Sequence, residues 1–119
     1  AQTMVRQGYA PYGPSKAALE AASRIWAQDL QNTGVTVNVY LPGGASDTDF
    51  IPGGVDRRGA DGNLLPASIM RRGAVWLSSA LSDGVTGGRF IARAWDGTVA
   101  SPVAPAGARS KSCEAPIIM

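Results

Sequence analysis

The sequence predicts an α/β fold in which two helices alternate with two short strands. Three observations support it: good helix formers dominate from Tyr12 to Leu30, β-branched residues fill Val35 to Leu41, and a second amphipathic pattern runs from Pro66 to Leu81. A segment of alternating side chains, Arg89 to Trp95, follows the second helix. Because a helix separates the two strands, we expect them to run parallel.

The first helix is predicted from Tyr12 to Asn32. Pro14 suits its first turn because the missing N–H would have no partner there. Gly34 supplies the stop, since glycine adopts the left-handed conformation without steric cost. The apolar side chains make a surface wider than one core face requires, with one row of Ala18, Ala22 and Ile25 and another of Leu19, Trp26 and Leu30. We therefore expect this helix to pack on two sides.

The strand Val35 to Leu41 leads into a loop that extends from Pro42 to Pro66. The loop is rich in glycine and long for a connection inside a compact domain, and loops of this kind tend to be functional or mobile. We interpret it as a ligand-facing loop. The second helix is expected near Ala67 to Leu81, and the second strand from Arg89 to Trp95.

Composition limits the functions open to the chain. Its 119 residues are 45% hydrophobic and 17% charged, which predicts one globular domain. The net charge is only +2, so no footprint for nucleic acid is expected. With no histidine and one cysteine, Cys113, the chain cannot form a Ser-His-Asp site or a zinc site of histidine and cysteine. No apolar run approaches the roughly 20 residues of a membrane span, and a cytoplasmic, soluble protein is expected.

Several other side chains are interpreted as having no chemical role. Asp47 and Asp49 belong to the solvated loop, so no metal site is predicted. Trp26, Trp76 and Trp95 fall within the apolar pattern of their elements and are interpreted as packing residues.

Three motifs together resemble a known family. These are Tyr12-Gly-Pro-Ser-Lys16, then "GVTVNVYLPGG", then "SDGVTGGRFIA". In order and spacing they resemble the C-terminal half of a short-chain dehydrogenase/reductase, over approximately Tyr9 to Asp96. The resemblance implies a partial Rossmann-like fold, which is the C-terminal half of a doubly wound parallel sheet with two strands and two main helices. We assign residues 1–101 to this half-domain. Residues 102–119 are rich in Pro, Ala, Gly and Ser without periodicity, so we expect them to form a flexible tail.

The resemblance implies an acid/base role for Tyr12 and a supporting role for Lys16. In such an enzyme the tyrosine hydroxyl exchanges a proton with the carbonyl oxygen as hydride passes between the nicotinamide and the carbonyl carbon. A free tyrosine has a pKa of about 10, so a neighbouring ammonium is needed to favour the phenolate. Lys16 lies one helical turn from Tyr12, and by resemblance it also binds the nicotinamide ribose.

The resemblance also implies that NAD or NADP binds at the start of the loop. Pro42, Gly43 and Gly44 would let the backbone approach the nicotinamide, while Ala45 and Thr48 occupy the stretch where the family contacts the carboxamide and phosphates. Either Thr48 or Ser46 could supply the hydroxyl, and Thr48 ranks first.

The sequence is compatible with two functions. No glycine-rich turn follows an N-terminal strand in these residues, and the family's serine would fall at or before Ala1, so a dinucleotide-binding half is expected to be missing. One hypothesis is therefore the catalytic half of an NAD(P)-dependent oxidoreductase, inactive alone. The alternative is a non-enzymatic remnant that serves as an interaction or oligomerisation module. In both cases we expect a homo-oligomer, most simply a dimer through the first helix or an open strand edge.

Overall fold

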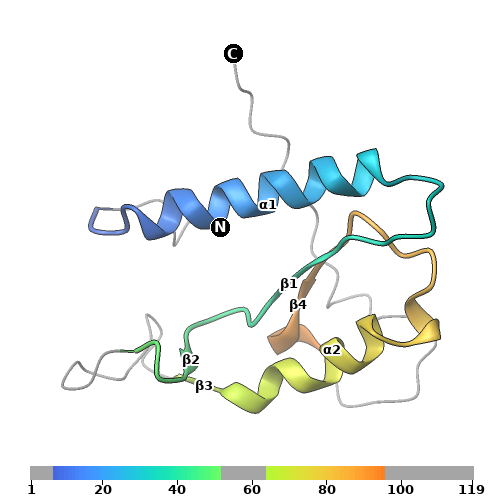
Figure 1. Ribbon diagram of the computed structural model, residues 1–119. Helices are drawn as coiled ribbons and strands as arrows, with labels where there is room; N and C mark the ends of the chain where they lie inside the picture. The colour runs from blue at the N-terminus through green and yellow to red at the C-terminus, as the bar shows by residue number, and fades with distance from the viewer. Residues whose placement is uncertain (1–6, 52–63, 96–119) are drawn as a thin grey trace. The chain divides into compact units, whose positions relative to one another are not determined.

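The computed structural model describes residues 7–51 and 64–95 (Figure 1). Predictions that concern residues 52–63 and the tail 102–119 lie outside the described residues. The described chain forms two compact units: the first contains residues 7–39 and 84–88, and the second contains residues 40–51, 64–83 and 89–95. The described residues contain both helices and short paired strands, so the predicted mixed α/β class is confirmed.

The first unit is built on helix α1, Tyr12–Asp29, which is the long blue helix of Figure 1. It ends three residues before the predicted boundary at Asn32. The amide of Gln31 bonds to the carbonyl of Gln28, only three residues back, and Asn32 has a left-handed φ of 66°. Tightening of this last turn ends the α-helix early. Gly34 takes the predicted left-handed conformation, with a φ of 83°.

The apolar rows of α1 remain largely exposed. Gly13 and Ala27 are the residues of this helix that are buried, and Ala27 is 5% exposed. Leu19, Ile25 and Trp26 are 51%, 56% and 50% exposed. The expected packing on two sides is therefore not made by the described residues, and the interpretation of Trp26 as a packing residue holds only if another surface covers it.

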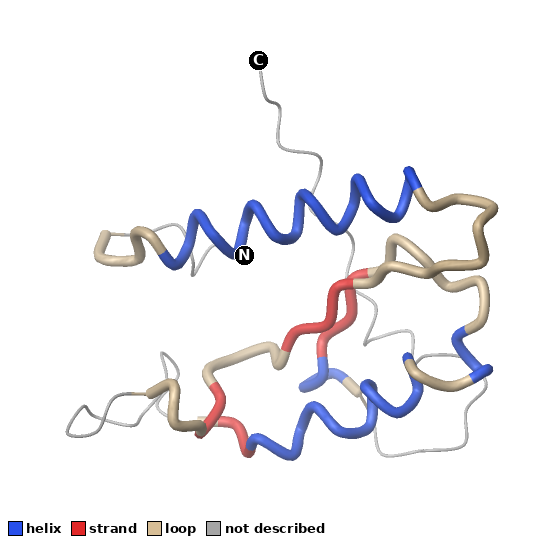
Figure 2. The backbone as a smooth tube through the Cα atoms, in the orientation of Figure 1, coloured by secondary structure: helices blue, strands red, loops and turns tan. Residues whose placement is uncertain are grey.

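The main sheet pairs β1, Val39–Leu41, with β4, Arg89–Ile91 (Figure 2). The amide of Gly87 donates to the carbonyl of Val37, and the amide of Val39 donates to that of Gly88. Residue numbers rise together on both segments, so the strands run parallel, as predicted.

The strand begins at Val39 rather than at Val35 because side chains replace part of the expected backbone ladder. The Thr86 hydroxyl accepts from the amide of Val37 at 3.1 Å. The Asn38 side chain donates to the carbonyl of Val85 at 2.7 Å and accepts from the amide of Gly88 at 2.9 Å. This Asn38 clasp holds residues 84–88 against the extended chain without a regular ladder.

The second helix is divided into three pieces. A 3₁₀ helix, η2 (Ala67–Met70), continues into α2 (Arg71–Leu77), and a second 3₁₀ helix, η3 (Ala80–Ser82), follows. The predicted continuous helix is interrupted at Ser79, whose backbone is extended and whose hydroxyl accepts from the amide of Leu81. Serine competes with helical hydrogen bonds in this way, and helical spacing alone does not reveal it.

The strand β4 is also shorter than predicted. After Ile91 the chain forms a 3₁₀ helix, η4 (Ala92–Ala94), instead of continuing to Trp95. The amide of Trp95 donates to the carbonyl of Ala92, and the amide of Arg93 donates to the carbonyl of Pro42 at 3.1 Å. The turn brings Trp95 into the core.

Aromatic rings form the core of the second unit. Phe90 is 1% and Trp76 is 8% exposed, so the prediction that Trp76 packs is confirmed. Ring centroids of Trp76 and Trp95 lie 5.6 Å apart, and those of Phe90 and Trp95 lie 6.2 Å apart. Tyr40 joins the cluster edge-on, 6.1 Å from Trp95. Centroid distances of this size are typical of favourable aromatic pairs.

Tyr40 also lies against the backbone of α2 at Gly73. A Cβ added to Gly73 would fall 2.5 Å from Cζ of Tyr40, so a glycine is needed there. The Tyr40 hydroxyl is buried and makes no hydrogen bond of ordinary geometry with the described residues. Burial raises the pKa of the Tyr40 phenol, and the nearby Gly73 backbone opposes this by a smaller amount.

Candidate active site

Tyr12 and Lys16 lie on adjacent turns at the amino end of α1. The ammonium nitrogen of Lys16 is 5.5 Å from the centroid of the Tyr12 ring, within the range of a cation–π contact. Tyr12 is 37% exposed and Lys16 is also exposed, so both can be reached from solvent. The hydroxyl of Ser15 donates to the carbonyl of Tyr12 at 2.7 Å, so it serves the helix backbone. The predicted proximity of Tyr12 and Lys16 is present.

The loop that follows β1 is fixed by contacts with β4 and η4. Gly43 has a φ of 89°, a conformation that favours glycine. A Cβ at Gly43 would lie 2.6 Å from Cγ2 of Ile91 and 3.0 Å from Cβ of Arg93. In this structure the close contact that requires a glycine at position 43 is therefore with Ile91 and Arg93 of the same chain. A role for Gly43 toward a nicotinamide stays a prediction.

The next part of the loop forms a short strand pair that the sequence did not predict. Strand β2, Ser46–Asp47, runs parallel to β3, Leu65–Pro66, with Ser46 opposite Leu65. The amide of Leu65 also donates to the carbonyl of Ala45 at 2.8 Å. A Cβ on Gly44 would lie 3.1 Å from Cδ1 of Leu65, which is a tight contact. The start of the predicted ligand-facing loop is therefore an ordered, paired segment.

The two candidate hydroxyls of this loop differ in their surroundings. The hydroxyl of Ser46 is buried and has no hydrogen-bond partner among the described residues. Thr48 is exposed, and its carbonyl accepts from the amide of Ile51 at 3.0 Å. Buried hydroxyls nearly always have a partner, so the unpartnered one needs an explanation. The sequence predicted Thr48 as the first candidate for the hydroxyl that contacts the cofactor. The one feature of the sequence that pointed to Ser46 was its position close to the Pro-Gly pair.

The predicted site residues fall into two groups. Tyr12 and Lys16 belong to the first unit, and the stretch from Pro42 to Thr48 belongs to the second. Each group is formed by residues that are close together in the chain. Across residues 7–51 and 64–95, no helix is long and apolar enough to cross a membrane, and no three acidic or cysteine side chains gather as a metal site.

Comparison with protein families agrees with the motifs. A family model described as enoyl-(acyl carrier protein) reductase matches residues 1–92, which include both site groups. The match and the motifs are those of the short-chain dehydrogenase/reductase class, and the mixed α/β structure is consistent with part of a Rossmann-like fold. The chain belongs to this enoyl-(acyl carrier protein) reductase family of short-chain dehydrogenase/reductases. No curated protein and no solved structure matched the chain.

Proposed function

We propose that this chain carries the acid/base part of an NAD(P)-dependent oxidoreductase that interconverts a carbonyl and a secondary alcohol. The observation that supports the proposal best is the Lys16 ammonium placed 5.5 Å from the Tyr12 ring centroid at the exposed start of α1. Membership of a family that generally uses a nicotinamide dinucleotide supports the choice of cofactor.

In the proposed mechanism, Tyr12 is the general acid and base. Its hydroxyl donates a proton to the substrate oxygen during reduction and accepts it again during oxidation, a role worth about 10² to 10⁴ in rate. The positive charge of Lys16 favours the phenolate that remains after proton donation. Lys16 also offers three N–H donors, which would hold the ribose of a bound cofactor.

The loop after β1 provides groups that suit a nicotinamide. The buried, unpartnered Ser46 hydroxyl can donate to a carboxamide oxygen or accept from its nitrogen. Thr48 offers a second hydroxyl nearby in the chain, and Pro42, Gly43, Gly44 and Ala45 form the backbone beside it. A bound nicotinamide would supply or accept the hydride.

We expect the 119 residues to show no turnover when tested alone. Residues 7–51 and 64–95, which the structure describes, contain no glycine-rich turn between a strand and a helix, which is the arrangement that holds a pyrophosphate. A positioned acid cannot act on a cofactor that is not held. Assays of reduced NAD and NADP with a panel of ketones should therefore give no oxidation above the rate without protein. Oxidation that is lost in Tyr12→Phe would overturn this expectation.

A hybrid enzyme tests the acid/base roles directly. Residues 9–96 would replace the corresponding half of an active short-chain dehydrogenase. We expect the hybrid to reduce the host's substrate, and Tyr12→Phe to lower kcat by about 10² to 10⁴. Ser15→Ala is the matched control and should keep kcat, because Ser15 bonds only to the helix backbone in the structure. A hybrid that keeps full activity in Tyr12→Phe would show that Tyr12 is not the acid.

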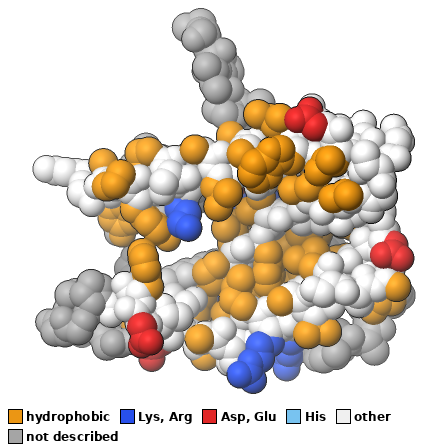
Figure 3. All heavy atoms as spheres, in the orientation of Figure 1, with side chains coloured by type: hydrophobic (Ala, Val, Ile, Leu, Met, Phe, Trp, Pro, Cys, Tyr) orange, Lys and Arg blue, Asp and Glu red, His pale blue; other side chains and the backbone are white. Residues whose placement is uncertain are grey.

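A second candidate function is an oligomerisation module, as the exposed face of α1 suggests. Hydrophobic side chains lie along this helix (Figure 3), and Leu19, Ile25 and Trp26 are each at least half exposed. Exposed apolar patches of this kind are common at protein interfaces. We propose that a second copy covers this face as a two-fold dimer. Sedimentation velocity at micromolar concentration tests it, and a stable monomer would contradict it.

A further inference from the structure

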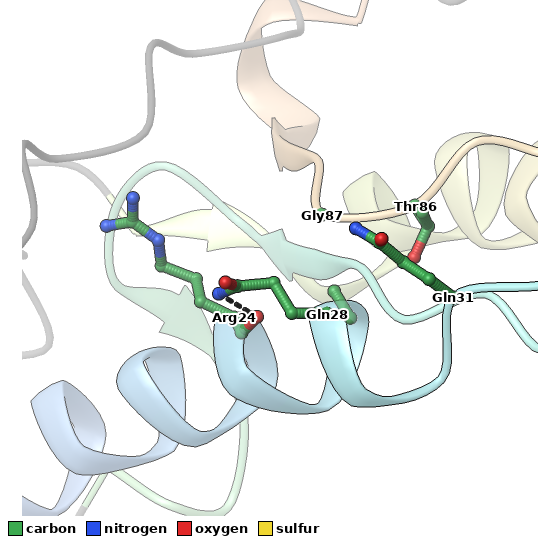
Figure 4. Close-up of a pocket in the computed structure, with 6 residues that line it drawn as sticks. Arg24, Gln28, Gln31, Thr86 and Gly87 are labelled. Carbon is green, nitrogen blue, oxygen red and sulfur yellow. Dashed lines mark hydrogen bonds between the residues drawn. The ribbon is translucent and has the colours of Figure 1, made fainter.

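Two polar side chains beside the hollow drawn in Figure 4 already bond to the backbone of the first unit. The hollow has a volume of ≈ 210 Å³ and lies between the carboxyl half of α1 and residues 84–88. The Gln28 amide donates to the carbonyl of Arg24 at 3.0 Å, and the Thr86 hydroxyl accepts from a backbone amide at 3.1 Å. The Ser46 hydroxyl of the second unit differs from these groups, because it is buried and has no partner among the described residues. The contacts that fix the position of this hydroxyl therefore determine which ligand atoms it can reach.

Residues from β4 and η4 hold the first part of the loop that carries Ser46. The carbonyl of Pro42 accepts from the amide of Arg93 at 3.1 Å. The next residue is Gly43, where an added Cβ would lie 2.6 Å from Cγ2 of Ile91, so this methyl group lies directly against the glycine backbone. Pro42 and Gly43 are thus tied to the end of the main sheet by one hydrogen bond and one close apolar contact.

Leu65 of β3 holds the second part of the loop. Its Cδ1 and Cγ atoms would lie 3.1 Å and 3.5 Å from a Cβ added to Gly44. Its amide donates to the carbonyl of Ala45 at 2.8 Å, and Ser46 is its partner in the parallel strand pair. The side chain and backbone of one leucine therefore contact three consecutive residues of the loop.

Two consecutive glycines, Gly43 and Gly44, would otherwise make this loop flexible. Glycine has the widest range of backbone conformations, and fixing the backbone of one residue changes an equilibrium by about tenfold. The side chains of Ile91 and Leu65 occupy the space beside the two glycines, so they restrict the loop where its own residues have no Cβ. The position of the Ser46 hydroxyl then follows from the packing of the chain and does not have to be established by a ligand.

We propose that Ile91 and Leu65 are positioning residues for the nicotinamide carboxamide and that they act through the Ser46 hydroxyl. This inference rests on the proposed function, in which that hydroxyl bonds to the carboxamide. Ile91 acts through its contact with Gly43, and Leu65 acts through Gly44 and the pairing of β2 with β3. A loop that is already in place loses less conformational entropy on binding, so its affinity for the nicotinamide end of the cofactor is higher.

The experiment is a titration of the ¹⁵N-labelled chain with nicotinamide mononucleotide, followed by NMR. This probe has the carboxamide and the ribose without the adenylate half of the dinucleotide. Ribose 5-phosphate is the control ligand, because it lacks the nicotinamide ring. Shifts of the amides of residues 43–48 that ribose 5-phosphate does not cause should report binding of the carboxamide. Ser46→Ala should weaken this binding by about three- to tenfold, which is the contribution of one hydrogen bond.

Two variants remove the contacts of the loop. Ile91→Ala and Leu65→Ala should each weaken binding by up to the same factor as Ser46→Ala, since they act through that hydroxyl. Ile91→Val is the matched control, because it keeps Cγ2 against Gly43 and should bind the probe as the native chain does. Because Ile91 lies in the main sheet and Leu65 lies in the separate pair of β2 and β3, failure of one variant to fold leaves the other to decide.

A double substitution separates positioning from a merely structural role. If Ile91 acts through the hydroxyl, Ile91→Ala should cause little further loss of affinity in the Ser46→Ala background. Equal losses in both backgrounds would overturn the inference, and so would native affinity in Ile91→Ala and Leu65→Ala, while the cofactor contact of Ser46 would stand. If the native chain does not bind the probe, or Ser46→Ala binds it as tightly, the proposed cofactor contact is wrong and the inference fails with it.

Discussion

Gly73→Ala tests how closely α2 packs on the aromatic core. Gly73 is buried within α2, and a Cβ there would lie 2.5 Å from Cζ and 2.8 Å from Cε2 of Tyr40. Carbon atoms in contact prefer about 3.5–4.0 Å, so the helix or the ring must move by close to an ångström. The ring has little freedom to do so, because its edge packs against Trp95.

Two opposing effects determine the size of the change. Replacing glycine by alanine inside a helix usually stabilises a protein by roughly 0.5–1 kcal/mol. Overpacking a core usually costs roughly 1–3 kcal/mol. Because the added Cβ of Gly73→Ala would meet rigid ring atoms, we expect the clash to dominate, with a net loss of about 1–2 kcal/mol in the free energy of unfolding.

The assay is urea denaturation followed by tryptophan fluorescence, since Trp76 and Trp95 lie in the same cluster. The matched background is Tyr40→Val, which removes the ring and keeps a residue suited to a strand. In that background Gly73→Ala should stabilise the chain by about 0.5–1 kcal/mol, because only the helix preference remains. If Gly73→Ala stabilises both backgrounds equally, the ring does not lie against α2 as described.

Three further results are expected. Burial raises the pKa of Tyr40, so as the pH rises the unfolded chain loses the phenolic proton before the folded chain does. The free energy of unfolding should therefore be constant below a pH of about 10 and fall above it. Urea midpoints across this range should show a smaller fall in Tyr40→Phe. Asn38→Leu leaves the buried amide of Gly88 without its acceptor, so it should cost about 1–3 kcal/mol and speed hydrogen exchange at Gly88, and unchanged exchange would argue against the clasp. Trp26→Glu should convert the proposed dimer to a monomer in sedimentation, whereas Val75→Glu, at a site 66% exposed on α2, should not; the same behaviour in both variants would exclude α1 as the interface.

Local sequence patterns determined which elements exist and in what order. Helix-forming residues with Pro14 in the first turn place α1, and β-branched residues place β1, because these preferences act within a few residues. The proximity of Tyr12 and Lys16 follows from the same kind of information, since residues four apart on a helix are neighbours wherever the helix lies.

Only the tertiary structure decided where several elements end. The Asn38 clasp shortens β1, and the hydrogen bond from Arg93 to Pro42 accompanies the turn that ends β4. These bonds join residues about fifty positions apart in the chain, and no local pattern records which partner a polar group will find. The break at Ser79 is local, but a serine also occurs in continuous helices, so the sequence alone did not decide it.

In the candidate site, too, some features were predicted by the sequence and others required the tertiary structure. Sequence identified the Pro42 to Thr48 stretch as the loop that follows a strand, where ligands of parallel sheets bind. The pairing of β2 with β3, the close contact of Gly43 with Ile91 and the buried Ser46 hydroxyl all required the structure. Burial and pairing depend on what the rest of the chain places beside a residue, and that is a property of the folded molecule rather than of any short segment.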